Sequence, residues 1–194
     1  MTQALIGFET RLPLQHWNAL LEEWLLLVDR YGRLAPRYPV WHLGERANAA
    51  LLASAACRCG WVGVCERFVN STDSVDLLLY LPDASVELIE VKEAADRSKG
   101  GTALMAATQQ VLNRTPPFEI NRRIGVAFNV IDREGLYQEE EIVSAIDNLR
   151  TFAPDAMAWY FPAQFRAFRY KRGGRSWISP GLLLIAKAAA AQIV

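Results

Sequence analysis

Three short apolar segments follow one another in the middle of the chain, with only four polar or turn-forming residues between them. They cover residues 61–69, 74–81 and 86–92, and the connections are 70–73 and 82–85. Parallel strands need a crossover of a dozen or more residues, whereas such short connections suit antiparallel neighbours. The sequence therefore predicts an antiparallel meander of three strands, which any fold of this chain must accommodate.

The hydrophobic period changes after the meander. Residues 102–112 have the spacing of a helix, and the apolar run 123–131 is typical of a strand that is buried on both faces. Alternation of helices and strands predicts an α/β protein with a mixed central sheet. Further helices are expected at 14–31, 43–56 and 138–152, and further short strands at 158–161, 165–171 and 182–187.

The first of these helices carries an unusually bulky apolar stripe that includes Trp17 and Trp24. Polar residues on its other side, such as Glu22 and Asp29, make it amphipathic. The stripe has two interpretations. It packs into the core of the protein, or it forms a partner surface through which two copies of the chain associate as a homodimer.

The charge of the chain is unevenly distributed. The 194 residues contain 21 basic and 21 acidic side chains, but residues 156–194 contain six basic side chains and no acidic one. In 165–177 basic residues are interleaved with aromatic ones, a combination that can bind phosphates and stack on bases. Solvated arginines beside core aromatics are the competing interpretation. The predicted nucleic-acid-binding residues are Arg166, Arg169, Lys171, Arg172 and Arg175.

Composition excludes several classes of protein. With 52% hydrophobic residues and a mean hydropathy of +0.05, the chain can bury a sizeable core and is neither disordered nor fibrous. The longest apolar runs are too short to span a bilayer and the N-terminus lacks a signal-peptide pattern, so we expect a cytoplasmic protein without a membrane partner. The cysteines, Cys57, Cys59 and Cys65, are expected to be buried and structural, with a zinc site as the alternative.

The end of the third predicted strand carries the residues with the clearest chemistry. Side chains alternate along a strand, so Glu90 and Lys92 share one face while Ile89 and Val91 share the other. Asp76 lies early in the preceding strand, and an antiparallel hairpin places it opposite the neighbourhood of Val91 and Lys92. Charged groups gathered at one end of a half-buried sheet are costly unless they are paired or used.

Neighbouring carboxylates repel each other unless a cation lies between them, and hard oxygen ligands suit Mg²⁺ or Mn²⁺. Asp76 and Glu90 are therefore candidate metal ligands. Lys92 is suited to orient a water molecule, or to neutralise developing charge, beside that metal. Glu45, near the start of the predicted helix 43–56, supplies a third carboxylate if that helix packs on the meander.

These residues and their order resemble the PD-(D/E)XK nuclease superfamily, which has the restriction-endonuclease-like fold. The resemblance implies an αβββαβ core with a mixed central sheet. The helix predicted at 14–31 is then an extra N-terminal helix before this core, and the elements predicted after it form a mixed α/β C-terminal extension. It covers about residues 42–132 and rests on Gly44-Glu45-Arg46-Ala47, Val75-Asp76-Leu77 and Ile89-Glu90-Val91-Lys92. The chain would then be a single domain, 1–194, with an N-terminal helical extension at 1–40, the nuclease-like core at 41–132 and a C-terminal extension at 133–194.

The resemblance also implies an activity. Members of the superfamily hydrolyse phosphodiester bonds with Mg²⁺ or Mn²⁺, so we expect a nuclease, with DNA preferred to RNA as its partner. The catalytic residues implied are Glu45, Asp76, Glu90 and Lys92. The metal ligands implied are Glu45, Asp76, Glu90 and the backbone carbonyl of Val91. The candidate auxiliary residues, which would match a glutamine of many members, are Gln109 and Gln110.

Two features depart from the pattern of the superfamily. Val75 stands where its name has a proline, and no Gln-x-x-x-Tyr motif of the recombination exonucleases begins at Gln109 or Gln110. A catalytically inactive nuclease fold that serves as a nucleic-acid- or protein-binding module is therefore the alternative function. A site for a small phosphorylated ligand is a third interpretation, and it requires a closed pocket rather than an open groove.

Overall fold

The computed structural model describes residues 5–35, 39–68, 74–94, 99–131, 133–134, 139–163, 169–172 and 174–189. Within these ranges the helices are η1 (Gln15–Trp17), α1 (Asn18–Leu34), η2 (Val40–His42), α2 (Glu45–Arg58), α3 (Gly100–Leu112) and α4 (Glu139–Arg150), where η marks a short 3-10 helix. The strands are β1 (Leu5–Thr10), β2 (Val62–Phe68), β3 (Ser74–Tyr80), β4 (Val86–Ala94), β5 (Arg122–Val130), β6 (Arg133–Glu134), β7 (Ala156–Phe161), β8 (Arg169–Arg172), β9 (Arg175–Ile178) and β10 (Leu182–Ala188).

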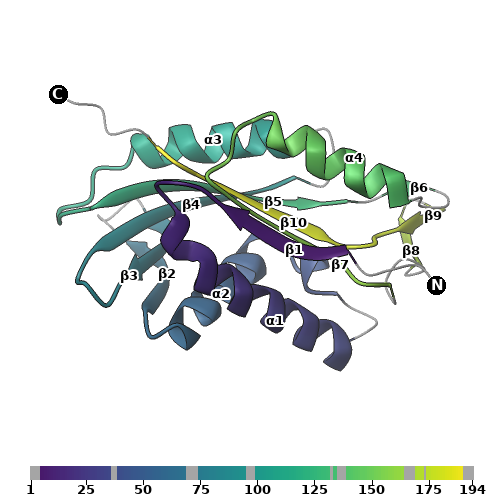
Figure 1. The fold of residues 1–194 in the computed structure, drawn as a ribbon, viewed down its shortest axis with the longest axis horizontal. Coiled ribbons are helices and arrows are strands. Elements are labelled where there is room, and N and C mark those ends of the chain that lie inside the picture. Colours follow the sequence, from purple (N-terminus) through teal and green to yellow (C-terminus); the bar gives the residue numbers. More distant parts are fainter. Residues whose placement is uncertain are drawn as a thin grey trace.

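Seven of these strands form one mixed sheet in the order β1-β7-β10-β5-β4-β3-β2. Strands β4 and β5 are parallel, and the other neighbouring pairs of this sheet are antiparallel, including the β2–β3–β4 meander that the short connections predict. Helices α1 and α2 cover one face of the sheet, and α3 and α4 cover the other (Figure 1). The protein is therefore mixed α/β in three layers, and α3 is the crossover between the two parallel strands.

The apolar stripe of α1 belongs to the core between that helix, α2 and the sheet. Trp17, which ends η1, and Trp24, in the middle of α1, are both 0% exposed. The core interpretation of the stripe is confirmed, and these two indoles cannot contact a second copy of the chain. Dimerisation through other residues of α1 stays a prediction.

Strand β1 is an element that the sequence does not predict. Its central residue, Gly7, weakens the strand pattern, because glycine is unfavourable in strands. In the structure, a Cβ on Gly7 would lie 2.8 Å from the indole of Trp159, so the glycine allows β1 to pair with β7 beneath that ring. Gly7, which in the sequence indicates an interruption of a strand, instead allows close packing against Trp159.

Strands β6, β9 and β8 form a smaller sheet, at the end of the molecule opposite β2 and β3 (Figure 1). Strands β8 and β9 are antiparallel neighbours, and β6 pairs with the other edge of β9. The first part of the strand predicted at 165–171 lies outside the described residues. No helix among those that the structure describes is long and apolar enough to cross a membrane.

Candidate functional site

Strands β3 and β4 stop pairing beside the residues to which the sequence assigns chemistry. Their antiparallel register runs from Tyr80 opposite Val86 to Leu77 opposite Ile89. Beyond this point the carboxylate of Asp76 replaces the backbone ladder, because its Oδ2 accepts a hydrogen bond of 2.7 Å from the backbone N–H of Val91. Asp76 therefore lies where the hairpin register predicts, next to Val91.

The neighbouring ladder is irregular at the same place. The register between β2 and β3 has no pair at Glu66 and Asp76, and Glu66 has a left-handed φ of 51°. The register is the same on both sides of this gap, with Cys65 opposite Leu77 and Arg67 opposite Val75, so neither strand has an extra residue and only the local backbone departs from regular pairing. Asp76 therefore lies where the pairing of β3 with both of its neighbouring strands is interrupted.

Glu90 is the buried member of the group. Its side chain is 0% exposed, and its Oε1 accepts a hydrogen bond of 2.6 Å from Nε of Arg114, just after α3. Its Oε2 is also buried and accepts no hydrogen bond from the described part of the chain. An unsatisfied carboxylate oxygen inside a protein is unfavourable, so this oxygen is suited to take up a proton or a cation.

Lys92 and Glu45 lie at the solvent side of the group. Helix α2 begins at Glu45 after Gly44, whose φ of 87° suits glycine, and it packs against β2, β3 and β4. Lys92 Nζ lies 4.0 Å from Glu45 Oε1, and the side chains are 32% and 36% exposed, respectively. The third carboxylate that the sequence expects from this helix is therefore brought to the meander.

The charges of this group influence one another. Burial, and then the neighbouring Asp76 carboxylate, raise the pKa of Glu90 to about 8, an effect that Lys92 opposes. Burial also raises the pKa of Glu45, an effect that Lys92 opposes and Asp76 increases. Without a cation, Glu90 is therefore mostly protonated at neutral pH.

Two hollows flank these residues. One, of about 230 Å³, lies between α2 and the part of β2 and β3 around Glu66 and Asp76, and both Glu45 and Asp76 line it. The other, of about 300 Å³, lies between the end of β4 and α3, and both Lys92 and Lys99 line it. The group is thus reached from solvent on two sides, although Glu90 itself is buried.

The two predicted auxiliary glutamines differ in position. Gln110 lies on the same face of α3 as Ala103 and Ala106, which line the second hollow. Gln109 is exposed, and its Nε2 donates a hydrogen bond of 3.3 Å to Oδ1 of Asn113. Gln110 is therefore the better placed of the two.

The predicted nucleic-acid-binding residues belong to the small sheet as far as they are described. Arg169 in β8 and Arg175 in β9 are exposed. The backbones of Lys171 and Arg172, also in β8, pair with Ser176 and Arg175 of β9. Arg166 lies outside the described residues. Exposed arginines fit both a solvated surface and a phosphate contact, so nucleic-acid binding by this segment stays a prediction.

Arg114 is a member of the site that sequence reasoning misses. It follows the C-terminal end of α3 by two residues, and the packing of α3 against β4 and β5 brings it to Glu90. In the sequence, a basic residue near the C-terminal end of a helix is usually explained by a favourable interaction with the helix dipole. The signal available in the sequence is indirect: a crossover helix between parallel strands must end beside those strands.

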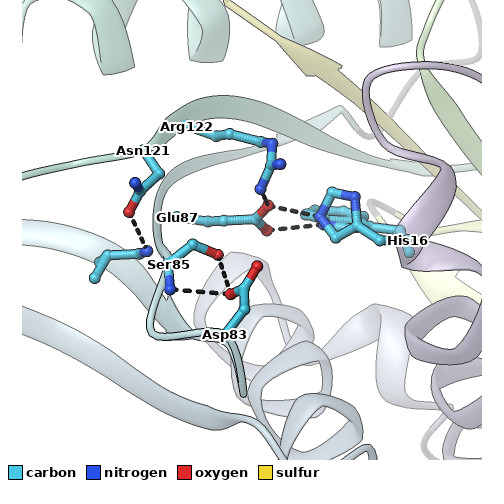
Figure 2. Close-up of polar contacts among 8 residues, drawn as sticks. His16, Asp83, Ser85, Glu87, Asn121 and Arg122 are labelled. Atoms are coloured by element: carbon cyan, nitrogen blue, oxygen red, sulfur yellow. Dashed lines mark hydrogen bonds and ion pairs between the residues drawn. The ribbon is translucent and has the colours of Figure 1, made fainter.

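A second buried carboxylate, that of Glu87, lies near the start of β4 (Figure 2). Its Oε1 is 2.7 Å from Nε2 of His16 and accepts a hydrogen bond of 3.2 Å from Arg122, while its Oε2 accepts one of 2.9 Å from the indole of Trp17. Both oxygens of Glu87 are thus satisfied. This carboxylate ties η1 to the sheet and has a structural role, in contrast to Glu90.

The turn before β4 is fixed by side chains as well (Figure 2). Oδ1 of Asp83 accepts hydrogen bonds from the backbone N–H and the hydroxyl of Ser85, and these bonds lower the pKa of Asp83. Oδ1 of Asn121 accepts a hydrogen bond of 2.7 Å from the backbone N–H of Val86. The start of β4, the strand that carries Glu90 and Lys92, is therefore held by side-chain hydrogen bonds.

Two carboxylates at the site, those of Asp76 and Glu90, are suited to a hard cation, although they are fewer than a complete set of protein ligands. Among the described residues, no group of three or more His, Cys, Asp or Glu side chains is arranged to hold a metal ion. Asp76 and Glu90 are nevertheless close enough to interact, and Oε2 of Glu90 lacks a donor within that part of the chain. A carboxylate pair fits Mg²⁺ or Mn²⁺, which commonly keep several water ligands. Ligation by Glu45 and by the carbonyl of Val91 stays a prediction.

The expectation of buried cysteines is wrong for two of the three. Cys57 and Cys65 are exposed, and Cys59 is partly buried. The reason is their location: Cys57 lies on the outer side of α2, and Cys65 lies in β2, which forms an edge of the large sheet.

The chain matches no protein-family model, no curated protein and no solved structure.

Proposed function

We propose that this protein is a Mg²⁺- or Mn²⁺-dependent nuclease that hydrolyses phosphodiester bonds in nucleic acid. The observation that carries the proposal is that Glu45, Asp76, Glu90 and Lys92 lie together where β3 and β4 diverge. Paired carboxylates with a lysine beside them are suited to hold a cation and to act on a phosphate.

The order of the elements supports the proposal. Helix α2, strands β2, β3 and β4, helix α3 and strand β5 follow one another in the αβββαβ order that the PD-(D/E)XK resemblance implies. The carboxylates come from α2, β3 and β4, which are the elements that the resemblance assigns to them. The parallel pairing of β4 with β5 makes this part of the sheet mixed, as expected for that core.

Each residue has a distinct task in the proposed reaction. A bound Mg²⁺ would polarise the phosphate and lower the pKa of the attacking water. Asp76 and Glu90 would hold that ion, and Asp76 is kept in place by the N–H of Val91. Lys92 is partly exposed, so it can orient a water molecule or balance charge on the phosphate. Glu45 holds the Lys92 ammonium through their ion pair.

The burial of Glu90 favours a second candidate function. Its side chain is 0% exposed and its Oε1 is already bound by Arg114. In a module that has lost catalysis, this contact would be an internal ion pair that supports the fold. The exposed Arg169 and Arg175 would then provide a surface for nucleic acid without cleavage.

Cleavage assays distinguish the two functions. The purified chain is incubated with plasmid DNA, single-stranded DNA and RNA, in Mg²⁺, Mn²⁺ or EDTA. A nuclease cleaves at least one substrate when metal is present, and Lys92→Ala or Glu90→Gln lowers the rate by at least about 100-fold.

The matched control is Glu87→Gln. Glu87 is a buried carboxylate on the same strand, but it lies outside the proposed site. We expect this variant to keep its activity at temperatures where circular dichroism shows it to be folded. Cleavage that survives Lys92→Ala would overturn the proposed mechanism, and nucleic-acid binding without cleavage by the wild-type chain would identify the binding module.

A further inference from the structure

Arg114 holds one oxygen of Glu90, while the other has no donor among the residues that the structure describes. Its Nε lies 2.6 Å from Glu90 Oε1, and its own side chain is only 17% exposed. Glu90 Oε2 is buried and accepts no hydrogen bond within the described residues. The two oxygens of one carboxylate therefore have different surroundings, and the contact with Arg114 sets which oxygen remains available.

Arg114 is itself held in place from the sheet. Nη1 of Arg123, in β5, donates hydrogen bonds to the carbonyl of Arg114 at 3.0 Å and to that of Val111 at 3.4 Å. These bonds tie the C-terminal end of α3 to the strand that runs parallel to β4. The guanidinium thus approaches Glu90 from a backbone that two elements fix.

We propose that Arg114 is a positioning residue, which orients Glu90 so that Oε2 faces a divalent cation bound beside Asp76. The inference rests on the proposed function, because it requires a metal at this site. Partners that hydrogen-bond to a metal-ligating carboxylate fix its orientation, and their loss typically weakens metal binding by about 10- to 100-fold.

Charge alone predicts the opposite effect. A guanidinium close to a cation site repels the cation, so its removal would tighten metal binding if Arg114 acted only through its charge. If Arg114 orients Glu90, its removal weakens metal binding despite the lost repulsion. The direction of the change in affinity therefore separates positioning from electrostatics.

The experiment is a titration of the full, metal-free chain with Mn²⁺, in which free Mn²⁺ is followed by electron paramagnetic resonance. Arg114→Gln is expected to bind Mn²⁺ at least about 10-fold more weakly than the wild type. Arg114→Lys keeps the charge but not the planar donor, so its affinity is expected to lie between the two. Arg46→Gln is the matched control, because Arg46 pairs with Glu66 near Glu45 and does not hold Glu90.

Equal or tighter Mn²⁺ binding by folded Arg114→Gln overturns the inference. If Arg114→Gln does not fold, Arg114→Lys decides: weaker binding than the wild type supports positioning, and equal binding overturns it. If the wild type binds Mn²⁺ but cleaves no substrate, the proposed nuclease function is wrong. The Mn²⁺ affinities of the Arg114 variants still decide whether Arg114 positions Glu90. A wild-type chain that binds no Mn²⁺ overturns both proposals.

Discussion

Glu87 and Glu90 are three residues apart on β4, and both side chains are 0% exposed. The fold compensates the two carboxylates very differently. Donors from His16, Trp17 and Arg122 satisfy both oxygens of Glu87, whereas Glu90 has Arg114 on one oxygen and no donor within the described chain on the other. Since an uncompensated buried charge is costly, Glu90 tends to take up a proton, whereas Glu87 is compensated by its three donors.

The raised pKa of Glu90 predicts that the stability of the metal-free protein depends on pH. The unfolded chain loses this proton near the ordinary pKa of 4.5, whereas the folded protein keeps it up to about pH 8. Folding therefore takes up a proton between these values. The free energy of unfolding falls as the pH rises through this window, by at most about 1.4 kcal/mol per pH unit, and this contribution levels off above it.

Glu90→Gln removes the titrating group and isolates its contribution. We expect urea unfolding in EDTA, between about pH 5 and 8.5, to show the wild type losing stability relative to Glu90→Gln as the pH rises. Glu45, whose pKa is also raised, is present in both proteins, so most of its effect cancels in the comparison. Parallel pH profiles for the two proteins would show that Glu90 is ionised throughout and that Arg114 dominates its environment.

Helix α3 sets the geometry of the site through its close packing on β5. Gly125 in β5 pairs with Glu90 in the parallel ladder. A Cβ at Gly125 would lie 2.4 Å from both the backbone N and the Oγ1 of Thr108 in α3. The helix can approach so closely because the strand has no side chain there, and the end of that helix carries Arg114 to Glu90.

We therefore predict that Gly125→Ala displaces α3 and damages the site. Backbone atoms of a helix cannot move aside singly, so we expect a loss of about 1–3 kcal/mol in the free energy of unfolding. Mn²⁺ binding should also weaken, because Arg114 moves with the helix. Urea unfolding and the Mn²⁺ titration measure the two effects. Met105→Ala, on the exposed side of α3, is the control and should change neither. Unchanged stability in Gly125→Ala would contradict this packing.

Elements with a clear hydrophobic period could be predicted from the sequence. The helices and the strands of the meander agree with the observed ones to within a few residues, because their apolar positions face a single core or sheet. Strand β1 could not be predicted, since Gly7 is explained by Trp159, which lies far away in the sequence. The same limit applies to the partner of Glu90: Asp76 follows from local register, but Arg114 depends on how α3 packs.

The large sheet combines strands from distant parts of the chain. Strand β10 pairs with β5 in the middle of the sheet, and β7 and β1 continue it beyond β10. On the face of the sheet that α1 and α2 cover, Trp17 and Trp24 belong to the same core as residues of β3, β4 and β5. The segments flanking the αβββαβ unit are therefore part of its core and of its sheet.

This arrangement predicts that residues 41–132 alone do not fold. Without β10, the edge of β5 would expose the backbone groups of a strand whose side chains from Ile124 to Val130 are buried in the intact protein. Without the N-terminal helix, the apolar face beneath it would be open to water. Deletion of several core residues costs far more than the typical net stability of a domain, about 5–15 kcal/mol. We expect the intact chain to give a cooperative urea transition by circular dichroism and the fragment to give none. A fragment that unfolds cooperatively would show that the αβββαβ unit holds its own core, and the metal titration could then be repeated on it to ask whether Glu90 and Arg114 need the rest of the sheet.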